Sequence, residues 1–555
     1  MKKRNLLRNM AMLAMLFTFS GCDFSKILNV YWKEEVPEVA GSIGLEYELN
    51  DDGVYHLIGM GDCKDAEVII PATYKSLPVV AIDTGAFSEC DFVVKVKILD
   101  GVMIIGDSAF WGCCNLTDIE IPQSVVRIGA SAFYGCCSLT EVVLPQSVVR
   151  IGSSAFSDCH ELEKIEIPSG VVSVGMNAFR GCEQLEYNLY QNVAYLGNAK
   201  NPYVALVGAM DNLQSAYTIH SETKVIGDGA FNGCSDLMEV ELPNGLISIG
   251  ERSFQACGLI SLDIPESVAY IGSDAFERCW LKEINVSGNN QEYCSFQGNL
   301  YTKDQKTLVR YAAGKDDEVF TIPDGVTAIG EDAFSYVQIL DKLVVSNSVT
   351  TIGYGAFDYA NLMRVEIGRG VTDIPSRAFS YCDQLQEIVV EDSNEFYASQ
   401  DGVLYDKAGT KLIRYPIAKE ENSFIVPDGV SSIRISAFYD CKNIESIIIP
   451  NSVKKIETDA FRYCRNLSSI DLGDGIEAIG SSSFADCEAL LSIVIGRNVT
   501  SIGGGAFRGC KGLSVIEFKG TIAEWNGITK KDGSWNSKVP AQEVVCMDGK
   551  VMLSA

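Results

Sequence analysis

The sequence contains little histidine and little positive charge for its length. Only three histidines occur in 555 residues (His56, His160 and His220), and they are scattered. Lysine and arginine number 45 against 73 aspartates and glutamates, which gives a formal net charge of −28. This balance argues against a nucleic-acid partner, because phosphate binding needs a basic surface. The acidity is typical of a solubilising shell, and the alternative is an acidic face that meets a cationic partner.

The short motifs of common catalytic sites are also missing. The sequence contains no GxSxG, HExxH or P-loop pattern. Carboxylate pairs are too numerous to single out one acid–base pair, which an exported hydrolase would need. No paired CxxC set accompanies the few histidines, so a zinc site is not expected. We therefore expect a protein that is not an enzyme, with no catalytic residue, metal or cofactor.

No apolar run after residue 22 is long enough to cross a membrane, but the chain begins with an export signal. Basic residues at positions 2–4 and Arg8 precede the short apolar stretch Met10–Phe19, which suits a signal peptide. The following Ser20-Gly21-Cys22 resembles a bacterial lipobox, although Phe19 departs from the usual aliphatic residue. That resemblance implies removal of residues 1–21, diacylation of Cys22 through its sulfur, and a lipid anchor at the cell envelope. The alternative is an ordinary cleaved signal.

What the sequence has in abundance is one repeated segment. A pattern close to I-G-x-x-A-F-x-x-C-x-x-L-x-x-I-x-I-P-x-x-V-x-x recurs with a period of 23 residues. A fixed period of this length is typical of a leucine-rich-repeat solenoid, in which each unit buries its apolar face by stacking on its neighbours. The fifteen phenylalanines of the pattern are Phe87, Phe110, Phe133, Phe156, Phe179, Phe231, Phe254, Phe276, Phe334, Phe357, Phe379, Phe438, Phe461, Phe484 and Phe507.

The order of residues inside one repeat predicts its local structure. The alternation in Ile119-Glu120-Ile121 predicts a short strand with both isoleucines inward. Ser131-Ala132-Phe133 is expected to form a helical or 3₁₀ turn, after Gly129 supplies a backbone conformation that a side chain would resist. The predicted fold is a repeat solenoid of about 15 repeats of 23 residues. A parallel β-sheet lies on its concave face, and short helical or 3₁₀ turns lie on its convex face.

Cysteine is frequent, with nineteen in the chain, and thirteen follow the repeat phenylalanine by three residues. Val337 and Ala360 take the same place in two repeats, so we expect a compact buried side chain there and a free thiol. Disulfides between neighbouring repeats are the alternative, although parallel Cβ directions need not suit a bridge. Cys114 and Cys137 stand beside ladder cysteines and are expected to be more exposed.

The repeat pattern also divides the chain. Residues 1–21 are the signal peptide, 22–40 a tether, 41–80 an N-terminal capping unit, 81–518 the repeats and 519–555 a C-terminal capping unit. The N-terminal unit is expected to begin with a hairpin around residues 45–58, and Trp525 and Trp535 are expected to cover the last repeat.

Three inserts interrupt the period, near residues 188–217, 287–318 and 391–422. The second and third are copies of each other, since Leu300-Tyr301 and Leu404-Tyr405 begin matching segments. Each is expected to be a β-hairpin, with turns around Asn201-Pro202, Lys303-Asp304-Gln305 and Lys407-Ala408-Gly409. We expect the hairpins to extend the solenoid sideways, either as structural spacers or as interaction sites.

Over residues 45–551 the repeat resembles the BspA-like class of leucine-rich repeats. The inserted hairpins and the tryptophan-containing tail are also similar to elements of that family. The resemblance implies a bacterial surface protein, whose relatives act in adhesion to host matrix proteins, in coaggregation with other bacteria or in attachment to host cells. It supplies no catalytic residues.

The candidate binding residues lie between the two inward positions of each predicted strand, on the concave face. Five residues of this row are aliphatic (Val143, Val344, Val389, Ile448 and Val494). Like charges on neighbouring parallel strands repel one another weakly. The aliphatic residues between them reduce this repulsion and offer contact area. The hypothesis is an adhesin or recognition module that binds a protein on a host or bacterial surface. For the row, the alternative is a solvated sheet face without a ligand. For the protein, it is a structural or envelope-organising spacer with no dedicated ligand. The seven acidic candidates are Glu120, Glu166, Glu241, Asp263, Glu366, Asp471 and Glu517.

Overall fold

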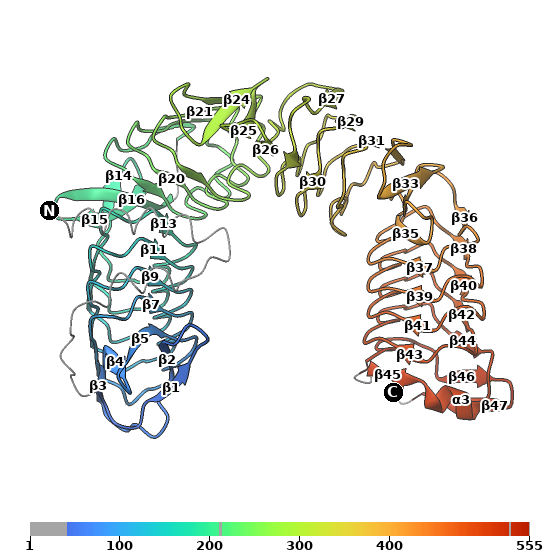
Figure 1. Cartoon of the computed structure of the whole chain (residues 1–555), viewed down its shortest axis with the longest axis horizontal. Helices are drawn as coiled ribbons and strands as arrows, with labels where there is room; N and C mark the ends of the chain where they lie inside the picture. The colour runs from blue at the N-terminus through green and yellow to red at the C-terminus, as the bar shows by residue number, and fades with distance from the viewer. Residues whose placement is uncertain (1–40, 210–213, 532–533, 554–555) are drawn as a thin grey trace. The chain divides into compact units, whose positions relative to one another are not determined.

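The computed structural model describes residues 41–209, 214–531 and 534–553. The expected signal peptide, Cys22 and the tether therefore lie outside the described residues. The chain forms two compact units: the first runs to Cys279 and includes Asn285–Glu292, and the second comprises Trp280–Ile284 and the chain from Tyr293. Both are solenoids of stacked turns, here called rungs, as Figure 1 shows. The described ranges contain about 20 turns, more than the fifteen repeats, because the inserts and the two ends add turns of their own.

The predicted strand forms in most repeats, and within the described residues these strands pair in parallel in separate groups of two to six. In β8 (Asp118–Glu120), Ile119 is buried and the residues beside it are exposed. Its partner β6 places Lys97 opposite Glu120. These row strands are β3 (Glu67–Ile70), β6 (Lys95–Ile98), β8, β10 (Glu141–Val143), β12 (Lys164–Glu166), β17 (Ala216–Thr218), β19 (Glu239–Glu241), β21 (Ser261–Ile264), β23 (Glu283–Val286), β27 (Val319–Thr321), β29 (Lys342–Val345), β31 (Arg364–Ile367), β32 (Glu387–Val390), β36 (Ser423–Ile425), β38 (Ser446–Ile448), β40 (Ser469–Asp471), β42 (Ser492–Ile495), β44 (Val515–Phe518) and β46 (Glu543–Cys546).

A second set of strands was not expected from the sequence. The segment before each conserved glycine forms a two-residue strand, and these short strands also stack in parallel, as β9 does on β7. In Figure 1, β37, β39, β41 and β43 follow one another in this way within the second unit. The short strands are β7 (Ile104–Ile105), β9 (Arg127–Ile128), β11 (Arg150–Ile151), β13 (Ser173–Val174), β18 (Val225–Ile226), β20 (Ser248–Ile249), β22 (Tyr270–Ile271), β28 (Ala328–Ile329), β30 (Thr351–Ile352), β37 (Ser432–Ile433), β39 (Lys455–Ile456), β41 (Ala478–Ile479), β43 (Ser501–Ile502) and β45 (Thr529–Lys530).

The segment around each phenylalanine is a series of β-turns rather than a helical or 3₁₀ turn. Bonds between residues three apart are present, as from the Tyr134 amide to the Ser131 carbonyl (3.1 Å). However, Ser131 (φ 52°) and Gly135 (φ 69°), two residues before and after Phe133, are left-handed and interrupt any 3₁₀ run. The turns form a third ladder, in which the Phe110 amide donates to the Ala132 carbonyl of the next rung (2.7 Å).

Gly129 has a different role from the one predicted. It is not among the residues with positive φ. A Cβ at this position would lie 2.5 Å from the amide nitrogen of Asp107 and 2.5 Å from the carbonyl carbon of Gly106. The glycine is therefore needed for the close approach of successive rungs. The left-handed conformation belongs to Ser131, two residues later.

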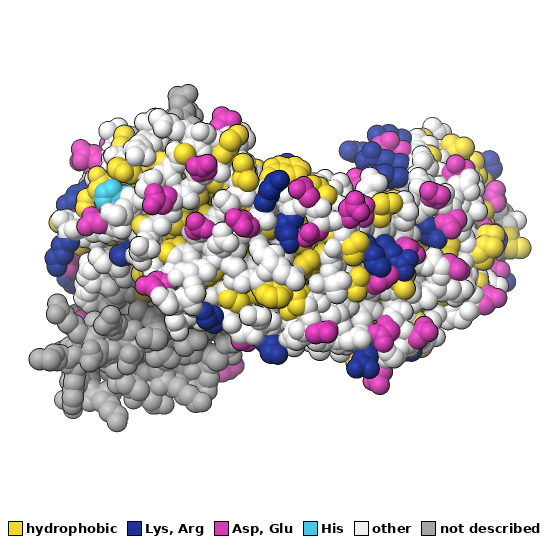
Figure 2. Space-filling view, turned by 90° about the horizontal axis from the view of Figure 1, so that it is seen from above, with side chains coloured by type: hydrophobic (Ala, Val, Ile, Leu, Met, Phe, Trp, Pro, Cys, Tyr) yellow, Lys and Arg dark blue, Asp and Glu magenta, His cyan; other side chains and the backbone are white. Residues whose placement is uncertain are grey.

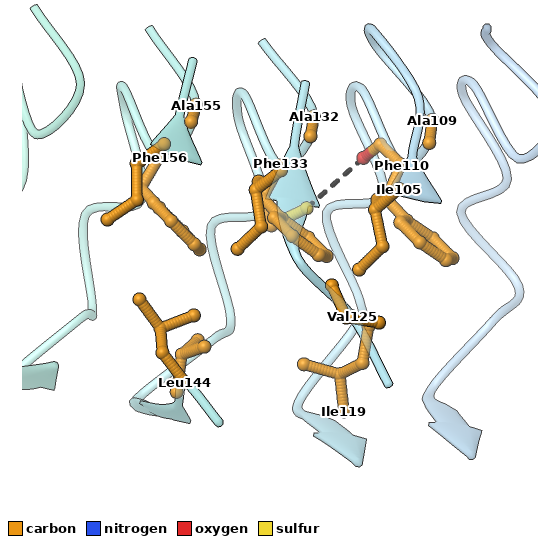
Figure 3. Close-up of a cluster of buried hydrophobic side chains, with 14 of the residues drawn as sticks. Ile105, Ala109, Phe110, Ile119, Val125, Ala132, Phe133, Leu144, Ala155 and Phe156 are labelled. Atoms are coloured by element: carbon orange, nitrogen blue, oxygen red, sulfur yellow. Dashed lines mark hydrogen bonds between the residues drawn. The ribbon is translucent and has the colours of Figure 1, made fainter. Parts of the chain in front are cut away.

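The core is a stack of phenylalanine rings between the strands. Figure 3 shows Phe110, Phe133 and Phe156 side by side on successive rungs, with Ile105 and Val125 near them. Neighbouring centroids in this stack lie 5.3 and 5.1 Å apart, with ring planes within 10° of parallel. Such offset stacking adds a favourable interaction to the burial of the rings.

The ladder cysteines complete this core as thiols. No disulfide joins any of the described cysteines, and most ladder members are buried. The buried ladder thiols donate to the carbonyl of the ring residue one rung earlier: Cys136 donates to Phe110 at 3.2 Å (dashed line in Figure 3). For Cys441 that acceptor is the insert residue Tyr415 (3.8 Å), and for the others it is a repeat phenylalanine. The position thus has a hydrogen-bonding role besides its size, and Val337 and Ala360 fill it without that bond. As expected, Cys114 and Cys137 are less buried, and their Sγ atoms lie 4.0 Å apart.

The described residues of the inserts continue the solenoid along its stacking direction, whereas the sequence analysis expected them to extend it sideways. Each has three strands, and the last one pairs in parallel with the next short strand, as β26 does with β28. The turns of the second and third inserts lie where expected, whereas the first turns at Ala199-Lys200 and places Pro202 inside a strand. The insert strands are β14 (Asn188–Tyr190), β15 (Val193–Asn198), β16 (Asn201–Ala209), β24 (Tyr293–Phe296), β25 (Asn299–Thr302), β26 (Thr307–Arg310), β33 (Tyr397–Gln400), β34 (Val403–Asp406) and β35 (Lys411–Arg414).

Two side chains of each copied insert replace the missing repeat residues. Tyr311 stacks on Phe334 (5.1 Å between centroids) and Tyr415 on Phe438 (5.0 Å), so each tyrosine takes the place of a repeat phenylalanine. The guanidinium of Arg414 is buried and donates to the Phe379 carbonyl at 3.0 Å. That carbonyl is the acceptor a cysteine would use in a regular repeat.

Both ends of the solenoid have their own elements. At the N-terminal end, the expected hairpin forms from β1 (Glu46–Leu49) and β2 (Tyr55–Gly59), followed by β4 (Thr73–Tyr74) and β5 (Leu77–Ile82). At the C-terminal end, Trp535 packs edge-on against Phe507 and Trp525 against Trp535, so the tryptophans cover the ring stack as expected. The helix α3 (Ile522–Gly527) and the antiparallel strand β47 (Gly549–Met552) complete this end. Within the described ranges, no helix combines the length and the apolar character needed to span a bilayer.

Candidate binding surface

The structure aligns the predicted row in continuous stretches. Here the row means the outward residues at the middle or end of the row strands. Val143 lies opposite Glu166 across β10 and β12. Thr218 lies opposite Glu241 across β17 and β19. Two longer stretches belong to the second unit. They are Thr321–Val344–Glu366–Val389 and Ile425–Ile448–Asp471–Val494–Glu517–Val545.

Two of the five aliphatic residues of the predicted row are exposed, whereas Val344, Val389 and Val494 are half-buried. Ile448 is 60% exposed and Val143 is 65% exposed. Ile425, which the sequence analysis did not include, is 67% exposed beside Ile448. Large aliphatic side chains exposed next to one another are more informative than single ones, because they offer contact area that water solvates poorly. The second unit therefore presents an apolar start to its longest stretch.

Four of the seven acidic candidates have a cationic partner on the same sheet face. Glu120 lies 2.5 Å from Lys97. Glu166 lies 3.7 Å from Lys164. The other two are Glu366, at 2.9 Å from Lys342 and 2.8 Å from Arg364, and Asp471, at 3.0 Å from Lys519. These pairs neutralise much of the acidic row.

The cluster around Glu366 is the most extensive of these pairs. Arg364 bonds Glu366 on its own strand and Glu387 on the next one. Partial burial acts to raise the pKa of Glu366, but the hydrogen bonds from Lys342 and Arg364 hold it below its usual value. Glu366 is therefore ionised and held in place at neutral pH.

The remaining three acidic candidates have no lysine or arginine partner within the described residues. Glu241 accepts a hydrogen bond from the hydroxyl of Thr218 at 3.1 Å. Asp263 accepts one from the amide of Asn285 at 3.1 Å. Glu517 is exposed between Val494 and Val545. These are the carboxylates that an external cationic group would find unpaired.

The mixture of charges is visible on the surface. On the face seen in Figure 2, lysine and arginine side chains lie next to aspartates and glutamates, with hydrophobic side chains between them. No group of three or more histidine, cysteine or acidic side chains with the geometry for a metal ion occurs in the described part of the chain.

The sequence analysis missed the cations that pair with the row. Lys164 and Arg364 stand two residues before Glu166 and Glu366, so the two-residue period of a strand puts each on the same face as its partner. Lys97 occupies the row position itself in β6. The ion pairs of Glu166 and Glu366 could have been predicted from a lysine or arginine two residues before a row position. Lys519, 48 residues from Asp471, gave no local signal.

A family model for the "BspA type leucine rich repeat region" matches residues 63–199, 210–299, 314–406 and 418–528 with six copies. The chain belongs to this family. BspA-type repeats thus account for most of the two solenoid units, including all seven acidic candidates of the row.

Several solved structures of bacterial leucine-rich proteins are similar to this BspA-type chain. A leucine-rich cell surface protein from Faecalibacterium prausnitzii shares 24% identity over 89% of this chain and 98% of its own, with a TM-score of 0.26. A leucine-rich repeat protein from Eubacterium ventriosum shares 22% identity over 84% and 93%, with a TM-score of 0.37. The pneumococcal vaccine antigen PcpA shares 15% identity over 92% and 99%, with a TM-score of 0.30. Comparison with curated proteins gives no match.

Proposed function

We propose that this BspA-type chain is a surface-exposed binding module that recognises a protein on a host or bacterial surface. In this proposal it is exported, anchored to the bacterial envelope through lipid on Cys22, and acts by binding rather than by catalysis. An adhesin is the specific form of this role that the family resemblance favours.

The observation that carries the proposal is the exposed row of the second unit. Ile425 and Ile448 form an apolar patch, and Asp471 and Glu517 follow it at the same register. An apolar patch with charged residues beside it is a usual composition of a protein-binding surface. The row strands hold these side chains on a rigid sheet, so little ordering is needed on binding.

A structural spacer without a dedicated ligand is the second candidate. The ion pairs at Glu120, Glu166 and Glu366 favour it, because carboxylates that are already paired offer less to a partner. The two candidates differ in what they require of the row: a spacer needs only its stability, whereas a binding module needs the exposed side chains themselves.

The test is attachment of the purified full-length protein, immobilised on beads, to immobilised host matrix proteins and to neighbouring bacterial cells. The double variant Ile425→Ser, Ile448→Ser should lose attachment about tenfold or more, since two exposed anchors are removed. Ile435→Ser is the matched control, because Ile435 is 39% exposed but lies on a turn outside the row. Unchanged attachment of the double variant would contradict the proposal.

Charge reversal separates the two candidates further. Glu120→Lys, Glu166→Lys and Glu241→Lys together should weaken attachment of a binding module and leave a spacer unaffected. Since Glu120→Lys also breaks the pair with Lys97, the swap Lys97→Glu, Glu120→Lys keeps that pair and serves as its control. Deletion of residues 81–518 should abolish attachment, and retention of attachment after that deletion would end the adhesin idea.

The anchor is tested separately. Cys22→Ala should prevent lipid labelling and release the protein from the membrane fraction, while the purified protein keeps its attachment to ligand. Membrane retention of the Cys22→Ala variant would contradict lipidation at this residue.

A further inference from the structure

The second insert carries a cavity that the row does not explain. It lies where the turn between β25 and β26 meets the loop before β28, and its volume is about 200 Å³. This is smaller than the roughly 300–1,000 Å³ of sites for drug-sized ligands, so it admits one small ring or side chain. Its lining residues are Phe296, Tyr301, Asp304, Gln305, Lys306, Pro323, Asp324, Gly325 and Val326.

One wall of the cavity is apolar. Tyr301 and Val326 are buried, whereas Phe296 at the end of β24 is 39% exposed. The rings of Phe296 and Tyr301 meet nearly edge to face, with centroids 6.2 Å apart and planes at 72°. Because Tyr301 fixes one side of Phe296, the phenylalanine ring remains available to cover the flat face of a ligand.

The rim is polar and carries charges of both signs. The carboxylate of Asp304 is oriented by the Thr302 hydroxyl (2.7 Å) and the Lys306 amide (3.0 Å). The Lys306 ammonium donates to the Gly325 carbonyl at 3.2 Å and so closes one side of the cavity. With Gln305 beside them, the rim offers acceptors and donors within one small space.

This combination narrows the chemistry of the occupant. A cationic group would face Lys306, and an anionic group would face Asp304 and Asp324. A purely apolar group would displace water from the exposed Asp304, Lys306 and Asp324 side chains without replacing the hydrogen bonds of that water, which costs free energy. A neutral molecule with one flat apolar face and several hydroxyl groups at its edge satisfies the ring and the rim together. A sugar ring has this chemistry.

The third insert provides an internal comparison, since it has the same backbone plan. The frame is the same there: Tyr405 matches Tyr301, and Pro427-Asp428-Gly429-Val430 matches the loop 323–326. The exposed ring and the polar rim are not kept. In place of Phe296, Asp304, Gln305 and Lys306, the third insert has Gln400, Ala408, Gly409 and Thr410. The differences thus fall on the side chains that would touch a ligand, while the side chains that build the hairpin are kept.

We propose that the cavity of the second insert binds a single sugar ring, the terminal hexopyranose of a glycan. Phe296 covers the face of the ring that carries C–H groups, and Asp304, Gln305 and Lys306 bond its hydroxyls. This site is separate from the row and does not depend on the proposed protein partner.

The test is saturation-transfer-difference NMR on the purified full-length protein. The probes are the methyl glycosides of glucose, galactose, mannose and N-acetylglucosamine at millimolar concentration. At least one glycoside should receive saturation, and Phe296→Ala should reduce the signal about fivefold or more, as loss of about 1 kcal/mol of ring contact implies. Gln400→Ala in the third insert is the matched control and should leave the signal unchanged.

Two further variants distinguish loss of binding from misfolding of the Phe296→Ala variant. Asp304→Ala, Gln305→Gly, Lys306→Thr gives the second insert the turn of the third and should also remove the signal. The reverse transfer, Gln400→Phe, Ala408→Asp, Gly409→Gln, Thr410→Lys, should restore saturation in the Phe296→Ala background. No transfer to any of the four glycosides, or equal transfer in Phe296→Ala, would overturn the proposal. Phe296-dependent binding of N-acetyl-lysine methyl ester in place of sugar would also overturn it.

Discussion

At the scale of single residues, glycine and left-handed residues serve two separate purposes in each repeat. Gly129 allows the backbones of two rungs to approach, and Ser131 carries the left-handed turn that precedes Phe133. The same pair of positions recurs at Gly106 and Ser108. A substitution should therefore have opposite effects at the two kinds of position.

Gly129→Ala is expected to destabilise the protein by about 1–3 kcal/mol, because its Cβ would meet backbone atoms of the previous rung that cannot move aside. The measurement is denaturant unfolding followed by circular dichroism. Ala256→Gly is the control of opposite sign. Ala256 is left-handed (φ 57°), so glycine should relieve strain and stabilise by up to about 1 kcal/mol despite its greater freedom in the unfolded chain. Equal destabilisation by the two variants would contradict this division of roles.

Asp228 is a half-buried carboxylate, and it gives the stability a pH dependence. It accepts the Glu251 amide at 2.8 Å, and burial raises its pKa from 3.8 to about 6. Because its pKa is higher in the folded state, the protonated form favours folding. Its contribution is full below about pH 4 and is lost as the pH rises through about 6.

Asp228→Asn keeps an acceptor for that amide and removes the half-buried charge. It is expected to raise the free energy of unfolding at about pH 7.5 by about 1–3 kcal/mol and to have little effect near pH 3.5. Denaturant unfolding at the two pH values measures the difference. Asp107→Asn is the comparison, since Asp107 has the same place in its repeat, but its side chain is 48% exposed and pairs with Arg127 at 3.4 Å. Asp107→Asn should not raise the free energy of unfolding. If Asp228→Asn raised it equally at both pH values, the burial of charge would not be the cause.

At the scale of elements, the inserts matter because they carry the stack across a break in the period. Arg414 donates to the Ser436 carbonyl at 2.6 Å and to the Phe379 carbonyl at 3.0 Å from a position only 3% exposed. Arg310 has the same place in the second insert and donates to the Asp332 carbonyl at 2.6 Å. The inserts therefore satisfy backbone groups that the regular repeat leaves to cysteine.

Arg414→Met is expected to destabilise the second unit by about 1–3 kcal/mol, because it leaves the buried Phe379 carbonyl without its donor. The Ser436 carbonyl loses one of its two bonds and keeps the Tyr439 amide at 3.1 Å. Lys411→Met on the same strand is the control, since Lys411 is exposed. Thermal unfolding measures both, and Arg414→Lys should recover part of the loss. If Arg414→Met were as stable as Lys411→Met, the bonds to the carbonyls would contribute nothing.

The sequence predicts the elements that follow from its period and misses those that depend on contacts between rungs. Alternation at Ile119-Glu120-Ile121 identifies the row strands, and the small replacements at Val337 and Ala360 identify a buried cysteine position. The short strands escaped notice because two residues, such as Arg127-Ile128, show no alternation. The role of Gly129 depends on an atom of the previous rung, and the bond from Arg414 to Phe379 joins residues 35 apart.

The positions of the row residues could be predicted from the sequence, but which carboxylates are paired with a lysine or arginine far along the chain could not. The register of Ile448, Asp471 and Val494 follows from the repeat. The pairing of Asp471 with Lys519 does not, because nothing local connects them. The cavity at Phe296 likewise depends on how a turn meets the loop of the following rung.

At the scale of the whole molecule, each rung contacts mainly the rungs beside it, so stability is a sum of local terms. We expect Gly129→Ala to accelerate hydrogen exchange in peptides from residues 104–155 and to leave peptides from residues 438–507 unchanged. Hydrogen exchange followed by mass spectrometry measures this. Uniform acceleration along the chain would indicate global cooperative unfolding instead.

Because almost every rung carries a ladder cysteine, the local opening of each rung can be followed through the reactivity of its thiol. Burial raises the pKa of Cys113 and Cys382 to about 12, and each thiol is occupied by the carbonyl of the rung before it. A thiol in this state does not react with alkylating reagents until its rung opens. A short pulse of iodoacetamide would therefore record which rungs open first, residue by residue, in the unmodified protein.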